Sequence, residues 1–125
     1  KAPSQHGLAT AEILAKKKID SRLIHSIIAH NDHYTKINRV TDIDDALCAS
    51  ELITGVIVVA TLVTPDKQLA KVKPSSVRKK FKDKSFAAKI PRQDIKDIER
   101  IGIKLDEFIS LALGAMQKIS SQLGL

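Results

Sequence analysis

Histidine is the residue type of this chain best suited to hold a metal ion, and three of its four histidines lie close together. His25, His30 and His33 fall within the segment from Leu23 to Tyr34, which also contains Asp32. A cluster of imidazoles and a carboxylate could bind Zn, Fe or Mn. Whether these side chains point the same way depends on the helix that carries them.

The helical phase of this segment separates its histidines. With residues placed at 100° steps, His30 falls at the edge of the apolar stripe and His25 lies on the far side, toward solvent. His33 follows the expected end of the helix near Asn31. Only His30 is therefore a candidate ligand, and the alternative is a helix-end histidine favoured by the helix dipole. The stripe is made by Leu23, Ile24, Ile27 and Ile28.

Two further residues are candidate partners of His30. Glu51 lies in an apolar segment, where we expect it to be buried and to need a metal, an arginine or a hydrogen-bond network. Gly55, one turn further on, leaves space for a ligand. His6 is the third candidate, in the first turn of the first expected helix. Histidine and carboxylate from three helices suit Zn, Fe or Mn, although no local spacing motif links them.

Helices must position these residues, because no segment alternates as a strand does. The fold class predicted is all-α, with an aliphatic core, since only four residues are aromatic. A strand is the weaker alternative for the apolar second half of the third helix. The helices are expected from Ser4 to about Lys17, from Asp20 to near Asn31, from Asp42 or Asp44 to Thr64, after Pro74, after Pro91, and from Leu105 to Gly124.

Positive charge is concentrated in one part of the chain. The net charge is +7, and residues 67–92, here called the basic segment, contain ten Lys or Arg and one acid, Asp83. A basic segment on an otherwise near-neutral domain implies a phosphate-bearing partner, either a nucleotide or a nucleic acid. The alternative is a solvated helix face. With one tyrosine and no tryptophan, stacking platforms for single strands are scarce.

Length and composition limit the other possibilities. At 125 residues the chain is expected to form a single helical domain, residues 1–125. Its one cysteine, Cys48, cannot form an internal disulfide and suits the cytoplasm. The longest apolar run, Leu52 to Val63, falls short of the roughly twenty residues that cross a bilayer, so no membrane partner is expected. Glycine-rich phosphate loops, nucleophile elbows and paired-cysteine zinc motifs are absent from the sequence.

Several segments, taken in order, resemble the second half of an HD-superfamily hydrolase domain, in a prokaryotic branch described as predicted HD-type hydrolases. The resemblance covers almost the whole chain, and its most specific part lies in the basic segment. The segments are His6–Leu8 with Ala11–Leu14, Ile27–Asn31, Ala46–Leu47 with Thr54–Ala60, Val72–Ala87 and Leu105–Ile109.

The resemblance implies a helical, metal-dependent phosphohydrolase that acts on nucleotides or other phosphate esters. In that superfamily the metal site takes a histidine, an adjacent His-Asp pair, two further histidines in many members, and an aspartate. His6 and His30 match the two further histidines, and Glu51 falls on or beside the aspartate position. Glu51 is a departure, because glutamate is one methylene longer.

The larger departure is that this sequence has no adjacent His-Asp pair, so its catalytic residues stay unknown. We expect the chain to be the C-terminal part of an HD-domain-like helical bundle that is incomplete at its N-terminus. The metal would be Fe, Mn, Zn, Co or Mg, held by His6, His30 and Glu51. Substrate phosphates would be held by the basic segment, through Arg78, Lys79, Lys80 and Lys82.

Two other functions fit the same residues. The chain could be a non-catalytic helical module whose basic segment binds a nucleotide or nucleic acid, or a partner-binding domain with a solvated basic face. The sequence does not fix the oligomeric state.

Overall fold

The structure is a computed structural model that describes residues 6–125, and among these residues every regular element is a helix. The predicted all-α fold class is confirmed. The chain divides into two compact units, the first ending at Cys48 and the second running from Ala49 to Leu125. One helix continues from the first unit into the second. The single domain over residues 1–125 stays a prediction.

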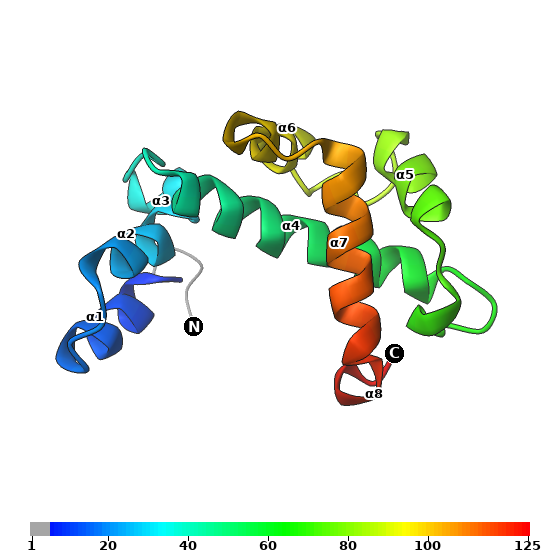
Figure 1. Cartoon of the computed structure of the whole chain (residues 1–125), viewed down its shortest axis with the longest axis horizontal. Helices are drawn as coiled ribbons and strands as arrows, with labels where there is room; N and C mark the ends of the chain where they lie inside the picture. Colours follow the sequence, from blue (N-terminus) through cyan, green and yellow to red (C-terminus); the bar gives the residue numbers. More distant parts are fainter. Residues whose placement is uncertain (1–5) are drawn as a thin grey trace. The chain divides into compact units, whose positions relative to one another are not determined.

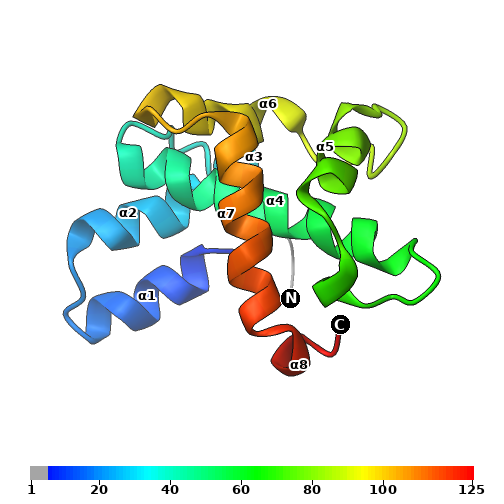
Figure 2. The same cartoon turned by 45° about the vertical axis from the view of Figure 1, so that its right-hand side comes forward.

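The first unit is built on two helices of nine residues, α1 (Leu8–Lys16) and α2 (Ser21–Ala29). They lie side by side in both views (Figures 1 and 2). The predicted start of the second helix at Asp20 is confirmed, since the Asp20 side chain caps α2 by accepting a hydrogen bond from the backbone N–H of Arg22 at 2.9 Å. The Arg22 guanidinium bonds the same carboxylate and lowers the pKa of Asp20 to about 2. The predicted start of the first helix at Ser4 lies outside the described residues.

A short helix, α3 (Asp32–Thr35), occupies the segment expected to be an exit loop. It contains His33 and ends at Lys36, whose φ is +60°. The Thr35 hydroxyl donates to the carbonyl oxygen of Ile28 at 3.1 Å, which ties α3 to the end of α2. One turn of helix without an apolar stripe leaves no periodic signal in the sequence, so this element was missed.

The long helix α4 (Asp42–Leu62) runs without interruption through 21 residues, which excludes the strand alternative. Asp42, Asp44 and Asp45 stand in its first turn, where negative charge interacts favourably with the helix dipole. By length and composition α4 is apolar enough to cross a membrane. The core helix of a protein without a membrane segment meets the same criterion, so this is weak evidence for a span.

The second unit is organised around α7 (Leu105–Lys118), which packs against α5 (Pro74–Lys82) and two 3-10 helices, η2 (Leu69–Lys71) and η3 (Asp97–Ile101). The Gln117 amide donates to the carbonyl oxygens of Leu69 (3.1 Å) and Val72 (3.0 Å), which fixes η2 to α7. The wholly buried aliphatic side chains of this unit include Ile53, Ile57, Val77, Ile95, Ile109 and Leu113.

The end of the chain differs from the single predicted helix. α7 stops at Lys118, Ile119 leaves helical backbone angles, and α8 (Ser120–Leu123) follows. The Ile119 N–H bonds the carbonyl oxygen of Met116, three residues back instead of four, so the turn tightens there. Gly124, at φ +69°, ends the helix as expected.

Arg92 closes the loop between α5 and α6 (Arg92–Lys96). Its guanidinium donates to the carbonyl oxygens of Phe81 (3.2 Å), Ala87 (3.2 Å), Ile90 (2.9 Å) and Phe86, and its Cζ lies 5.4 Å from the centre of the Phe81 ring. Arg92 is thus a structural cation, because backbone carbonyl oxygens accept the hydrogen bonds of its guanidinium group.

Candidate metal site and basic segment

His6 and His30 come together in the first unit, as the metal hypothesis requires. His6 precedes α1 and is exposed, while His30 follows the last residue of α2 and is half-buried. Their ring centres are 5.0 Å apart and the ring planes meet at 73°. Two residues separated by 24 positions are thereby brought within reach of one ligand.

One hydrogen bond fixes the orientation of the His30 ring. The Nδ1 atom lies 2.6 Å from the carbonyl oxygen of Ile27. Because a carbonyl oxygen only accepts, Nδ1 must carry the proton, and Nε2 of the neutral ring keeps its lone pair. Metal-binding histidines are commonly oriented in this way, with the second nitrogen donating to a carbonyl or a carboxylate.

Gly7 allows the two helices to approach at this point. Its φ is +89°, and a Cβ atom added there would lie 2.5 Å from the carbonyl oxygen of Ile27 and 3.4 Å from Cε1 of His30. Only glycine fits both the backbone angle and the contact. The Asn31 amide donates to the carbonyl oxygen of His6 at 3.2 Å, which holds the backbone next to Gly7.

Glu51 is exposed, and the expectation that it lies buried among aliphatic side chains is wrong. It stands on α4, three residues after Cys48, which is buried and whose Sγ lies 3.7 Å from the carbonyl oxygen of His30. α4 is apolar on nearly all sides, so its sequence gives no phase that distinguishes an inward from an outward position. An exposed carboxylate needs no metal to compensate for burial.

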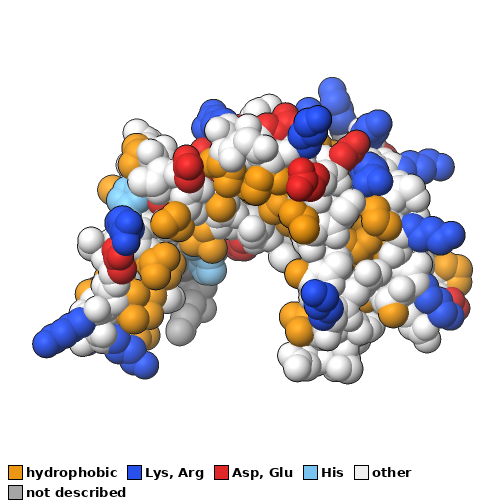
Figure 3. All heavy atoms as spheres, in the orientation of Figure 1, with side chains coloured by type: hydrophobic (Ala, Val, Ile, Leu, Met, Phe, Trp, Pro, Cys, Tyr) orange, Lys and Arg blue, Asp and Glu red, His pale blue; other side chains and the backbone are white. Residues whose placement is uncertain are grey.

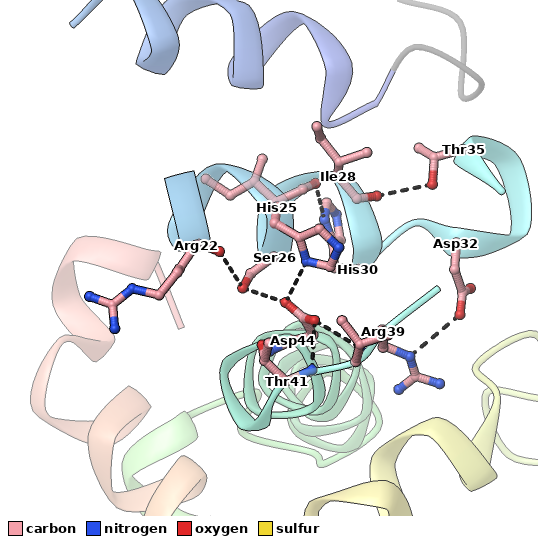
Figure 4. A network of polar contacts seen from close by, with 12 residues as sticks. Arg22, His25, Ser26, Ile28, His30, Asp32, Thr35, Arg39, Thr41 and Asp44 are labelled. Atoms are coloured by element: carbon pink, nitrogen blue, oxygen red, sulfur yellow. Dashed lines mark hydrogen bonds and ion pairs between the residues drawn. The ribbon is translucent and has the colours of Figure 1, made fainter. Parts of the chain in front are cut away.

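His25 takes part in a polar network that sequence analysis missed (Figure 4). Its Nδ1 lies 3.2 Å from Oδ1 of Asp44, and the Ser26 hydroxyl donates to the same oxygen at 2.6 Å. The backbone N–H groups of Val40 and Thr41 both donate to Oδ2 at 2.9 Å. The His25 side chain is half-buried, so the predicted solvent-facing position is wrong, because Asp44 in the first turn of α4 lies against it.

Asp44 is wholly buried and charged. Burial raises the pKa of its carboxyl, but the hydrogen bonds from Ser26, Val40, Thr41 and His25 outweigh burial and hold the pKa well below its usual range. The network joins α2, the loop before α4 and the first turn of α4. The network gives the buried carboxylate of Asp44 a structural role and keeps His25 in one orientation.

In the second unit the four predicted phosphate-binding residues lie on α5 but have different surroundings. Arg78 is paired, with Nε 3.8 Å from Oδ1 of Asp106 and Nη1 3.4 Å from Oγ of Ser110. Lys80 places its ammonium group 4.8 Å from the centre of the Phe86 ring. On the face drawn in Figure 3, Lys and Arg side chains gather over the part of the second unit that includes α5.

Lys79 and Lys82 are both exposed, and within residues 6–125 neither side chain makes a hydrogen bond or an ion pair. Lys79 faces a cavity that Lys80 also lines, whereas Lys82 and Arg78 are not among its lining residues. The structure therefore separates the four predicted residues into two that share a cavity and two that do not.

Comparisons of the chain with protein-family models, with curated proteins and with solved structures found no match.

Proposed function

We propose that this protein is a metal-dependent phosphohydrolase in which His6, His30 and Glu51 hold a divalent cation. The observation that carries the proposal is the pairing of two imidazoles: the ring centres of His6 and His30 lie 5.0 Å apart, and the bond from His30 Nδ1 to the Ile27 carbonyl oxygen fixes the orientation of the His30 ring. The two histidines lie within the first unit, and Glu51 is the carboxylate that the sequence adds to them as a third ligand. The resemblance to HD-superfamily hydrolases points to the same residues.

The donor set fits a metal of the Zn, Fe, Mn or Co type. Imidazole suits Zn and Fe, and a carboxylate is common to catalytic sites of both. Glu51 follows Cys48 by three residues on the continuous helix α4 and is exposed, so its carboxylate is accessible to an ion. Three protein ligands leave a coordination position for water, which is the arrangement of catalytic rather than structural sites.

A bound metal would supply Lewis-acid activation of a phosphoryl oxygen and of water. The residues of the chain would bind the metal and the substrate and orient them. The Ile27 carbonyl oxygen keeps the His30 ring in one tautomer, and Gly7 lets the backbone that carries His6 come close. Lysines of the basic segment would attract a phosphate-bearing substrate. Because Cys48 is the only cysteine, we place the activity in the cytoplasm.

Metal binding and turnover test the proposal together. Mn, Fe, Co, Zn and Mg would be titrated into the full chain by calorimetry, and each form would be assayed with p-nitrophenyl phosphate and a set of nucleotides. We expect His30→Ala to lower metal affinity by at least about tenfold, the loss caused even by altering a residue behind a ligand. His33→Ala is the matched control, since His33 is exposed on α3 and outside the group.

Equal metal affinity in the His30 and His33 variants would refute the metal site. Absence of turnover with every metal would refute the hydrolase. Glu51→Gln separates the carboxylate from the histidines, because it keeps the size of the side chain while removing its charge.

A second candidate function is binding of nucleic acid without catalysis, favoured by the charge of the basic segment. It predicts an affinity that falls steeply as salt rises and does not respond to a chelator. Replacing Arg78, Lys79 and Lys80 together by alanine should abolish that binding.

A further inference from the structure

A cavity of about 350 Å³ lies in the second unit, between the end of α4, the loop that follows it and α5. This volume is within the range of small-molecule sites, roughly 300–1,000 Å³. One part of its lining is apolar and comes from Ala60, Val63, Pro65 and Val72. An apolar group of a ligand could therefore pack against this lining and displace water from it.

The charged part of the lining carries one sign. Lys71, Lys79 and Lys80 line the cavity, and no acidic residue is among the lining residues. Lys71 is paired with Asp66, its Nζ 2.8 Å from Oδ2, and Lys80 is held over the Phe86 ring. Lys79, which has no ion pair within the described chain, is the cation available to a ligand.

Two hydroxyl groups complete the lining. Thr64 donates its proton to the carbonyl oxygen of Thr61 at 2.7 Å, so it can only accept from a ligand. Ser76 makes no side-chain hydrogen bond among residues 6–125 and can donate. The donors that a ligand would meet are thus ammonium groups and one hydroxyl, which suit an anion.

We propose that this cavity binds a phosphate monoester whose organic group is small and apolar. The ammonium group of Lys79, with those of Lys71 and Lys80 on the same lining, matches a phosphate dianion better than a singly charged carboxylate. The apolar lining accounts for the organic group, which inorganic phosphate lacks. The proposal involves residues of the second unit alone and does not rest on the proposed metal site.

Titration of the full chain with simple probes, in EDTA and followed by two-dimensional NMR, tests the class of ligand. Phenyl phosphate should bind more tightly than inorganic phosphate, benzoate or phenol, and should shift the amides of residues 60–80. Benzoate binding as tightly as phenyl phosphate would overturn the assignment to phosphate. Equal affinity for phenyl phosphate and inorganic phosphate would overturn the role of the apolar lining.

Paired variants test the place of binding. Lys79→Ala should weaken phenyl phosphate binding by roughly two- to fivefold, the range of one partly exposed charge pair. Lys82→Ala removes the same charge from the same helix outside the cavity and should leave affinity nearly unchanged. Equal losses would mean that the net charge of α5 binds the probe, and would overturn the proposal.

A third variant addresses the apolar lining. Val63 is 55% exposed, so we expect Val63→Ser to leave the fold intact. This variant should lower the affinity for phenyl phosphate while leaving the affinity for inorganic phosphate unchanged. If both weaken together, or neither does, the organic group does not occupy the cavity. Each of these results is independent of metal binding, since the chelator is present throughout.

Discussion

Asp44 carries its charge in the protein interior because each carboxylate oxygen accepts two hydrogen bonds. Oδ1 accepts from the Ser26 hydroxyl and from Nδ1–H of His25, and Oδ2 accepts from the backbone N–H groups of Val40 and Thr41. An asparagine cannot replace it, since either orientation of the amide turns an NH₂ group toward two donors. The same reasoning makes Asp44 sensitive to acid, because a proton would remove one acceptor.

We predict that Asp44→Asn destabilises the protein by about 2–3 kcal/mol at pH 7, the cost of leaving buried donors without acceptors. The pKa of Asp44 is lower in the folded protein than its ordinary value of 3.8. Its contribution is therefore complete above pH 5 and is lost as the pH falls below about 4 toward the folded pKa. Urea unfolding between pH 7 and pH 3 measures this. The difference in free energy of unfolding between wild type and variant should become smaller as the pH falls.

Asp42→Asn is the matched control, because Asp42 is an exposed carboxylate in the same turn of α4. The role given to the buried carboxylate would be contradicted if the loss in free energy of unfolding caused by Asp44→Asn stayed constant with pH. It would also be contradicted if Asp42→Asn caused the same loss.

At the scale of elements, the approach of α1 to α2 depends on one glycine. Gly7→Ala would place a Cβ atom against the Ile27 carbonyl oxygen and force an L side chain to φ +89°. We predict a loss of about 1–3 kcal/mol in the free energy of unfolding, the usual cost of such strain. Denaturant unfolding measures it, and metal affinity should fall with it if the His30 orientation is disturbed.

Gly114→Ala provides the comparison, since nothing lies within 4 Å of its added Cβ atom and Gly114 has a helical φ within α7. Alanine there should stabilise by up to about 1 kcal/mol. If Gly7→Ala behaved like Gly114→Ala, the close approach of the two helices would be refuted.

At the scale of the whole molecule, α4 is the element that continues from one unit into the other. It supplies Asp44 and Cys48 to the interior of the first unit and Ile53 and Ile57 to that of the second. Ser50→Pro would interrupt the hydrogen bonds of α4 near the boundary, so we predict a loss of about 3 kcal/mol or more and lower helicity by circular dichroism.

Ser50→Ala keeps the backbone hydrogen bond and should unfold like the wild type. If Ser50→Pro were equally stable, α4 would be two helices joined at this point instead of one.

The sequence by itself determined the helices that have one apolar stripe and recognisable ends. Asp20 precedes α2 as predicted, and α5 begins at Pro74, one residue from the predicted start. The concentration of charge in residues 67–92 was equally plain. These features depend on neighbouring residues, so local pattern is sufficient to predict them.

Only the tertiary structure decided which side chains share a site. It paired His25 with Asp44, exposed Glu51, occupied Arg92 with backbone carbonyls, and placed Lys79 but not Lys82 at a cavity. Helical phase orients a residue relative to the apolar stripe of its own helix, and α4 has almost no polar face to set that phase. Contacts between residues far apart in sequence depend on the path of the chain between them, which periodicity does not contain.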